Sequence, residues 1–291
     1  MKDIKVQGMI LAALGVFIIS FDALLVRLAN LDASVISFYR GLFMGISMLI
    51  LWRRSSSKTW IPANKLEFMN FSLVVILSAL GTCLFVFSVK YTAAANTVVL
   101  LATSSFFAAI FSYFLLKERI QKQTVIAIVI SFLGVFIVFG NSFSFSGNWI
   151  GDILGLALAI TMGIELTLLR KYGHFPTMLV ISLSGFLVAG IMYIFSDKLL
   201  DISLESLFWL SIMGFIQIPL AMYFIFISTK YITSAEVSLF TTIETTMAPI
   251  WLWLFLSEIP PKMTIIGGTL VIFAIFINAL PSIIKKRNKT Y

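Results

Sequence analysis

The sequence predicts an all-α polytopic membrane protein, with ten transmembrane helices arranged as two inverted five-helix repeats. Three observations support this prediction: composition, a series of long apolar runs, and a second half that repeats the first. Of the 291 residues, 60% are hydrophobic and 12% are charged, whereas typical globular domains contain about 25% charged residues. Lipid rather than water is therefore expected to cover most of the surface, and no room is left for a soluble domain.

The predicted spans follow from length, because crossing the hydrocarbon core as a helix takes roughly 20 apolar residues. The first run is too long for the apolar part of a signal peptide, so we interpret it as the first span. The ten spans are, in order, 8–29, 34–52, 70–89, 95–116, 123–140, 151–170, 177–195, 207–228, 234–257 and 263–280.

Basic residues occur mainly in alternate loops between these spans. They lie around 2–5, 53–65, 117–122, 170–171, 230 and 285–289, while the other set of loops holds only Arg27, Lys90, Lys198 and Lys262. Positive residues are retained in the cytoplasm. A multi-pass protein of the cell (inner) membrane with both termini cytoplasmic is therefore predicted, and the net charge of +8 indicates topology rather than nucleic-acid binding.

The second half repeats the first at a constant offset, since Tyr91 matches Tyr231, Glu118 matches Glu258 and Thr124 matches Thr264. Each copy contains five spans, and an odd number inverts the second copy in the membrane. The predicted organisation is a first repeat at 1–140, an external linker at 141–150, a second repeat at 151–281 and a basic cytoplasmic tail at 282–291.

Three segments, Ala93–Arg119 with its ending Leu115–Arg119, Val125–Val138, and Tyr39–Gly41, resemble the EamA-type transporters of the drug/metabolite transporter superfamily. The resemblance covers nearly the whole chain. The second copy departs from the motif, because Ile259 stands where the first copy has an arginine. The resemblance implies a ten-helix transporter of small metabolites, commonly amino acids or related compounds, often moved outward.

Ionisable residues within the spans are the sharpest functional clue, because one at a helix centre costs about 2.5–3.5 kcal/mol on insertion scales. Asp22 and Arg40 each lie roughly 9 Å below the outer ends of their spans, at about 1.5 Å per residue. Opposite charges at matched depth on consecutive helices can form a structural ion pair. They can equally form an outer gate, with Arg40 binding a substrate carboxylate.

Two glutamates lie deeper. Glu244 is roughly 15 Å from the cytoplasmic side, near the midplane, among threonines, and is a candidate proton carrier or counter-charge for a substrate amine. Glu165 falls in the inner third of the sixth span, where it is either functional or paired with nearby Arg170. The predicted substrate-binding residues are Arg40, Glu244, Tyr39, Thr103, Ser104, Thr241 and Trp251, and the predicted gating or proton-coupling residues are Glu244, Asp22 and Glu165.

No catalytic or metal-binding pattern is present, since the only histidine, His174, and the only cysteine, Cys83, lack partners at ligand spacing. We therefore expect no cofactor, no enzymatic activity and no nucleic-acid partner. The predicted function is secondary active transport of small polar metabolites by alternating access, with proton coupling and oligomeric state left open and a monomer compatible with the sequence. The alternative is a membrane accessory or lipid-carrier flippase-type protein whose buried charges are structural.

Overall fold

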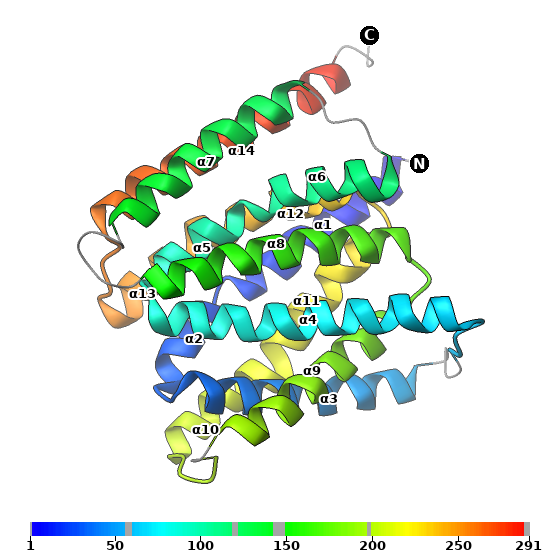
Figure 1. The fold of residues 1–291 in the computed structure, drawn as a ribbon, viewed down its shortest axis with the longest axis vertical. Coiled ribbons are helices and arrows are strands. Elements are labelled where there is room, and N and C mark those ends of the chain that lie inside the picture. The colour runs from blue at the N-terminus through cyan, green and yellow to red at the C-terminus, as the bar shows by residue number, and fades with distance from the viewer. Residues whose placement is uncertain (1, 56–59, 118–121, 142–148, 197–198, 288–291) are drawn as a thin grey trace.

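The computed structural model describes residues 2–55, 60–117, 122–141, 149–196 and 199–287. Within these ranges every regular element is a helix, which is the expected outcome for a chain in lipid, where each backbone polar group must be bonded within its own segment. The helices run roughly along a common direction in a layered bundle, and α1 begins at the end of the bundle where α14 finishes (Figure 1).

The helices have the following bounds: α1 Lys2–Ile19, α2 Asp22–Ala29, α3 Ala33–Arg54, α4 Lys65–Tyr91, α5 Ala94–Ala102, α6 Ser104–Leu116, α7 Lys122–Asn141, α8 Trp149–Lys171, α9 Thr177–Phe195, α10 Leu204–Ser211, the π-helical turn η2 Ile212–Gln217, α11 Ile218–Ser228, α12 Ser234–Leu239, α13 Thr241–Leu256 and α14 Lys262–Arg287.

Among the described residues, seven segments are long and apolar enough to cross a membrane: Val6–Ala29, Ala33–Arg54, Lys65–Tyr91, Ala94–Leu116, Trp149–Lys171, Thr177–Phe195 and Leu204–Ser228. This confirms a multi-pass membrane protein. The other three predicted spans correspond to shorter apolar helices, at Val125–Val138, Ile243–Leu256 and Lys262–Ala274. The ninth predicted span contains two helices, α12 and α13, which meet at Phe240.

Interrupted helices recur along the chain. The first predicted span breaks at Ser20–Phe21 and the fourth at Thr103, while the eighth contains the turn η2. Two of these breaks place an acid in the first turn of the helix that follows, Asp22 in α2 and Glu244 in α13. The N-terminus of a helix carries partial positive charge. The breaks therefore supply local stabilisation for carboxylates that would otherwise be costly at this depth.

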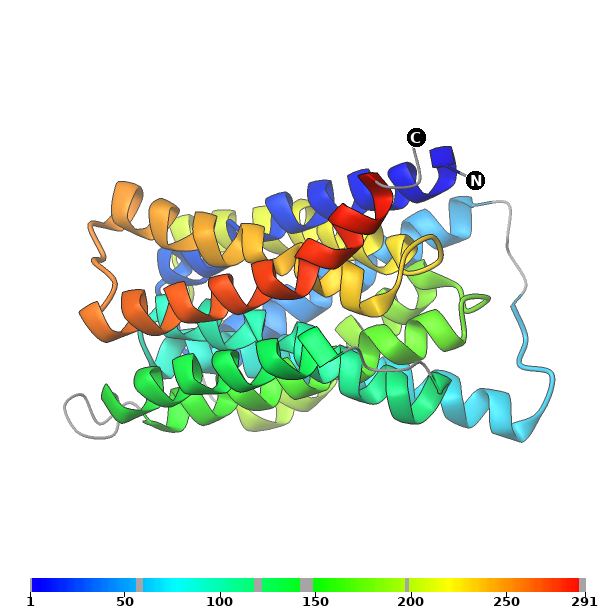
Figure 2. The ribbon, with the colours of Figure 1, turned by 90° about the horizontal axis from the view of Figure 1, so that it is seen from above.

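Two helix pairs are held by glycines in direct contact. Helix α3 packs on α9, where Gly41 faces Gly185, and α7 packs on α14, where Gly134 faces Gly267. These pairs lie at opposite edges of the bundle (Figure 1), and Figure 2 shows α7 and α14 side by side along its length. Small residues let membrane helices approach at backbone distance. Between the edges, α4 packs on α8 and α1 packs on α11.

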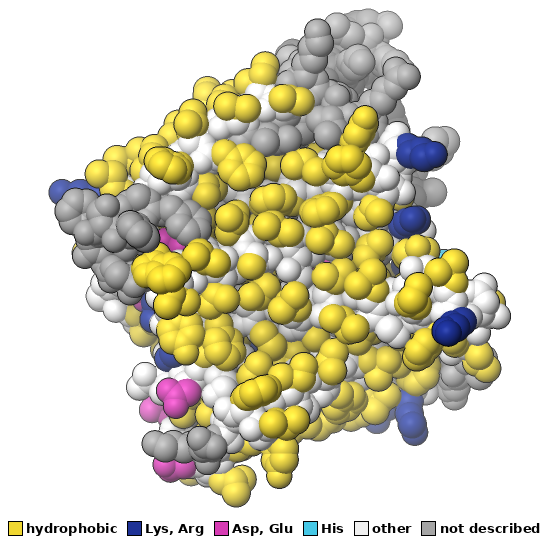
Figure 3. All heavy atoms as spheres, viewed as in Figure 1, with side chains coloured by type: hydrophobic (Ala, Val, Ile, Leu, Met, Phe, Trp, Pro, Cys, Tyr) yellow, Lys and Arg dark blue, Asp and Glu magenta, His cyan; other side chains and the backbone are white. Residues whose placement is uncertain are grey.

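The surface has the pattern expected of a lipid-facing protein. Hydrophobic side chains cover the middle of the face seen in Figure 3. Basic side chains lie at both ends and stand out at the edge where α1 begins, while the visible acidic side chains lie at the opposite edge. Glu118 and Arg119 of the Leu115–Arg119 motif lie outside the described residues, as do 142–148 of the linker and 288–291 of the tail.

Candidate functional site

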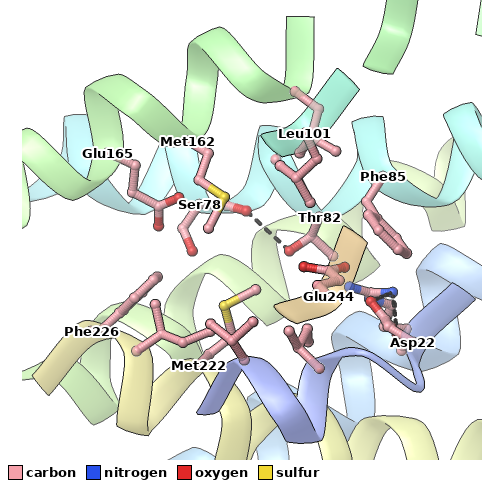
Figure 4. Close-up of a pocket in the computed structure, with 16 residues that line it drawn as sticks. Asp22, Ser78, Thr82, Phe85, Leu101, Met162, Glu165, Met222, Phe226 and Glu244 are labelled. Carbon is pink, nitrogen blue, oxygen red and sulfur yellow. Dashed lines mark hydrogen bonds and ion pairs between the residues drawn. The ribbon is translucent and has the colours of Figure 1, made fainter. Parts of the chain in front are cut away.

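A cavity lies in the centre of the bundle, and residues of α1, α2, α3, α4, α5, α8, α11 and α13 line it. It encloses about 600 Å³ of space not filled by atoms, counting its mouth. Its wall is mainly apolar, but four charged side chains line it: Asp22, Arg40, Glu165 and Glu244 (Figure 4). The sequence predicts these four as charges within the spans, together with Glu236 nearer a span end, which does not line the cavity. Helices far apart in the chain bring the four to one place.

Asp22 and Arg40 form a buried ion pair. The Nη1 atom of Arg40 lies 2.9 Å from Oδ2 and 3.0 Å from Oδ1 of Asp22, and both side chains are 1% exposed. The guanidinium also lies over the ring of Phe85, 5.3 Å from its centroid. Its Nε atom is buried without a hydrogen-bond partner. The ion pair therefore leaves one N–H group of the Arg40 guanidinium without a partner.

Glu244 lies beside this pair at the same end of the cavity (Figure 4). Its side chain is buried, and within the described part of the chain no hydrogen bond or ion pair to it is found. Two carboxyl groups thus share one guanidinium. Asp22 already makes both short contacts to Nη1 of Arg40. Only part of the positive charge of Arg40 is therefore left to stabilise the Glu244 carboxylate.

Glu165 occupies the opposite end of the cavity (Figure 4). It projects from α8 toward α4, where Ser78 faces it. Its Oε1 atom is buried and has no hydrogen-bond partner. Thr161, one turn earlier, does not supply one, because its hydroxyl donates to the Ala157 carbonyl oxygen at 2.8 Å. The Glu165 carboxyl group lines the cavity.

Two stretches of the chain, residues 6–140 and residues 149–280, match the profile of the EamA-like transporter family. The chain belongs to this family. The cavity is therefore that of a membrane transporter rather than that of an enzyme, since the relatives are also transporters.

The transporter is 24% identical over 282 residues to the pseudopaline exporter CntI of Pseudomonas aeruginosa, a match that covers 94% of this chain and 95% of the exporter. It is 25% identical over 218 residues to an uncharacterized transporter of Archaeoglobus fulgidus, covering 74% of this chain and 70% of the relative. A crystal structure with 14% sequence identity has a TM-score of 0.70 and covers 94% of this chain and 96% of that chain. At this identity the likeness shows the fold alone.

Two aromatic residues predicted to contact substrate in this EamA-like transporter do not line the cavity. Trp251 stacks on Phe21 with ring centroids 4.5 Å apart, and its Nε1 donates to the Ser20 hydroxyl at 3.1 Å. It thus packs against the break in the first span. The Tyr39 hydroxyl donates to the Leu199 carbonyl oxygen at 2.7 Å. Tyr39 directly precedes Arg40 on α3, but successive residues of a helix point in different directions. Arg40 therefore lines the cavity and Tyr39 does not.

The predicted threonine and serine contacts also lie elsewhere. The Thr103 hydroxyl donates to the Leu100 carbonyl oxygen at 2.6 Å, at the break between α5 and α6. Ser104 is fully buried but is not part of the cavity wall, and its hydroxyl has no partner among the described residues. The side chain of Thr241 lies outside what the structure describes.

Sequence reasoning missed the stripe of α4 that lines the cavity and carries two hydroxyl side chains. Ser78, Thr82 and Phe85 line the cavity from three successive turns, and the Thr82 hydroxyl donates to the Ser78 carbonyl oxygen at 3.0 Å. The signal was present in the sequence, because these residues recur at helical spacing in an otherwise apolar span. Hydroxyl side chains can be satisfied by their own helix, so the spacing alone did not distinguish a wall from packing.

At the end of the transporter away from the start of α1, polar contacts join its first and second halves. Arg27 of the first half lies 3.2 Å from the Glu258 carboxylate of the second, and within the first half it donates to the Thr92 carbonyl oxygen at 3.0 Å. Deeper in the same region, Asp152 accepts from the Thr92 hydroxyl at 2.7 Å and from the Asn96 amide at 3.1 Å. These contacts hold the two halves together at that end of the molecule.

Proposed function

We propose that this transporter exports small polar metabolites that carry an amine, amino acids or related compounds, by alternating access between its two halves. The observation that supports this most strongly is the charge of the central cavity. Its described wall contains three carboxyl groups and one guanidinium, and the guanidinium is already paired with Asp22. A buried charge needs a partner, and a substrate ammonium group supplies one to Glu244.

The proposed architecture is ten crossings in two inverted halves, 1–140 and 151–281. Helix contacts support it, because α3 packs on α9 and α7 packs on α14, which are the second and fifth predicted spans of each half. The contact of α4 with α8 is likewise matched by that of α11 with α1. Such symmetry is expected of inverted repeats around a central site.

The proposed direction is outward, from the cytoplasm across the cell membrane, with both termini on the cytoplasmic side. The long match to the pseudopaline exporter supports export, and the basic residues at the end where α1 begins support this orientation. The contacts of Arg27 with Glu258 and of Asp152 with Thr92 then lie on the outer side, where they close the cavity to the exterior.

Thermal unfolding of the purified transporter against a panel of amino acids, amines, carboxylates and nucleotides tests this proposal. A ligand at tenfold its dissociation constant is expected to add about 1.4 kcal/mol to the free energy of unfolding. Stabilisation by amine-containing solutes supports the proposal. Stabilisation by none of the panel favours the accessory or flippase-type alternative, in which the buried charges only hold helices together.

Replacing Glu244 by Gln is expected to weaken the binding of amines by about tenfold or more, because a hydrogen bond to a charged group contributes about 1.5–3 kcal/mol. It is also expected to remove the pH dependence of transport, since an amide does not exchange a proton in this range. Uptake into proteoliposomes over a series of pH values measures both effects. The matched control is Glu205→Gln, an exposed glutamate on α10. Unchanged pH-dependent transport in the Glu244 variant contradicts the proton-carrier role.

A further inference from the structure

The cavity has a second acidic end that one amine on Glu244 does not use. We propose that the preferred substrate carries two amine groups separated by an aliphatic chain, a basic amino acid or a short diamine, with one ammonium at Glu244 and the other at Glu165. This inference rests on the proposed function and deepens it, because it names the substrate class for the same cavity.

The two acids are far enough apart to bind separate groups. Along α4, Ser78 faces Glu165 and Phe85 lies under the Arg40 guanidinium, next to Glu244 (Figure 4). Seven residues of helix separate Ser78 from Phe85, which at about 1.5 Å per residue is on the order of 10 Å. A single ammonium group reaches a carboxylate only at about 2.7–2.9 Å. One amine therefore cannot bind both ends, whereas two amines on a short chain can.

Glu165 lacks the charged partner that a buried carboxylate needs. Its side chain is 6% exposed, its Oε1 has no hydrogen bond, and Ser78 is a neutral neighbour. Among the described residues that line the cavity, Arg40 is the only cation, and it is paired with Asp22 at the other end. An ammonium group offers three N–H donors and a positive charge. The Ser78 hydroxyl offers the Glu165 carboxyl group a neutral donor. A substrate with a second amine thus supplies the positive charge that the cavity wall does not, and donors for Oε1.

The wall between the two acids suits methylene groups. Met162, Leu101 and Met222 line the middle of the cavity, between Glu165 and Glu244 (Figure 4). Methionine is flexible and adapts to an apolar chain of variable length. Lysine matches this order of acid, apolar wall and acid. Its two amines are placed at the two glutamates, and the four-carbon chain between them lies along the apolar wall. Arg40 lines the same cavity, at the end that holds Glu244, and carries the positive charge that the carboxylate of an amino acid requires.

Matched ligand pairs that differ by one terminal amine test the inference on the full-length transporter in detergent and in proteoliposomes. The pairs are lysine with norleucine, and 1,4-diaminobutane with 1-aminobutane. We expect the diamine member of each pair to bind at least about tenfold more tightly, from one added charged hydrogen bond. In Glu165→Gln that preference is expected to fall to near unity while norleucine binding stays unchanged. In Glu244→Gln both members are expected to weaken, and in Glu205→Gln neither.

The outcomes separate this inference from the function on which it rests. Equal binding of lysine and norleucine by the unmodified transporter overturns the two-amine substrate but leaves amine export standing. A preference for lysine that persists in a folded Glu165→Gln variant also overturns it, since the second amine then binds elsewhere. Absence of binding by every amine in the pairs and in the wider panel overturns the proposed function itself. The comparison within the unmodified protein does not depend on any variant folding.

Discussion

Replacing Arg40 by Gln is expected to abolish transport and to lower the free energy of unfolding by about 3–5 kcal/mol, the usual cost of breaking a buried ion pair by removing one partner. Asp22 is 1% exposed and receives both of its short contacts from Arg40. The substitution leaves Asp22 and Glu244 side by side in a buried wall whose described residues include no other cation. Thermal unfolding in detergent measures the stability, and uptake into proteoliposomes measures transport.

Two further variants separate the pair from the loss of a positive charge in general. Arg53→Gln removes an exposed arginine from the end of α3 and is expected to leave stability almost unchanged. The double variant Asp22→Asn, Arg40→Gln removes both charges and is expected to recover much of the stability, because the pair no longer leaves an unpaired ion. If Arg40→Gln alone unfolds at the temperature of the unmodified protein, the pair does not contribute to stability.

The exchanged pair, Asp22→Arg with Arg40→Asp, distinguishes a structural role from substrate contact. Restored transport indicates that pairing is sufficient. Continued loss of transport in a stable double variant indicates that the guanidinium must stand on α3, next to Glu244 and Phe85, where it faces the cavity. The unused Nε of Arg40 favours the second result.

Depth along a helix is what the sequence predicts well. The meeting of Asp22 with Arg40 follows from equal distances to the membrane surface, and this distance depends only on residue count. The same reasoning selects Glu165 and Glu244, and all four line one cavity. Burying a charge in lipid is costly, so ionisable residues within spans are rare. Each one is therefore a strong indication of where the functional site lies.

Direction around a helix is what the sequence predicts poorly. Helical spacing puts Trp251 on the face of Glu244, but Trp251 stacks on Phe21 and donates to Ser20, at the break in the first span, which is distant in sequence. Tyr39 turns toward the Leu199 carbonyl for the same kind of reason, because a loop distant in sequence supplies its partner. Helix interruptions and loop partners depend on tertiary packing, which hydrophobic periodicity does not encode.

Replacing Gly185 by Ala is expected to destabilise the transporter by about 1–3 kcal/mol or more, the usual cost of overpacking a filled interface. A Cβ at this position lies 2.5 Å from the Gly41 carbonyl oxygen and 2.8 Å from the Gly45 nitrogen. Both are backbone atoms, so no side-chain rotation relieves the contact and α3 must move away from α9. Gly190→Ala on the same helix is the matched control, since nothing in the described structure lies within 4 Å of its Cβ.

The same substitution should also weaken ligand binding, although Gly185 does not touch the cavity. Gly41 directly follows Arg40 on α3, so a displacement of α3 at Gly41 carries the guanidinium away from Asp22 and Glu244. Binding of an amine that stabilises the unmodified protein is therefore expected to fall in Gly185→Ala and to persist in Gly190→Ala. If Gly185→Ala loses stability but binds normally, α9 supports the fold without setting the position of Arg40. If it loses neither, close backbone contact between α3 and α9 is not required for the position of Arg40.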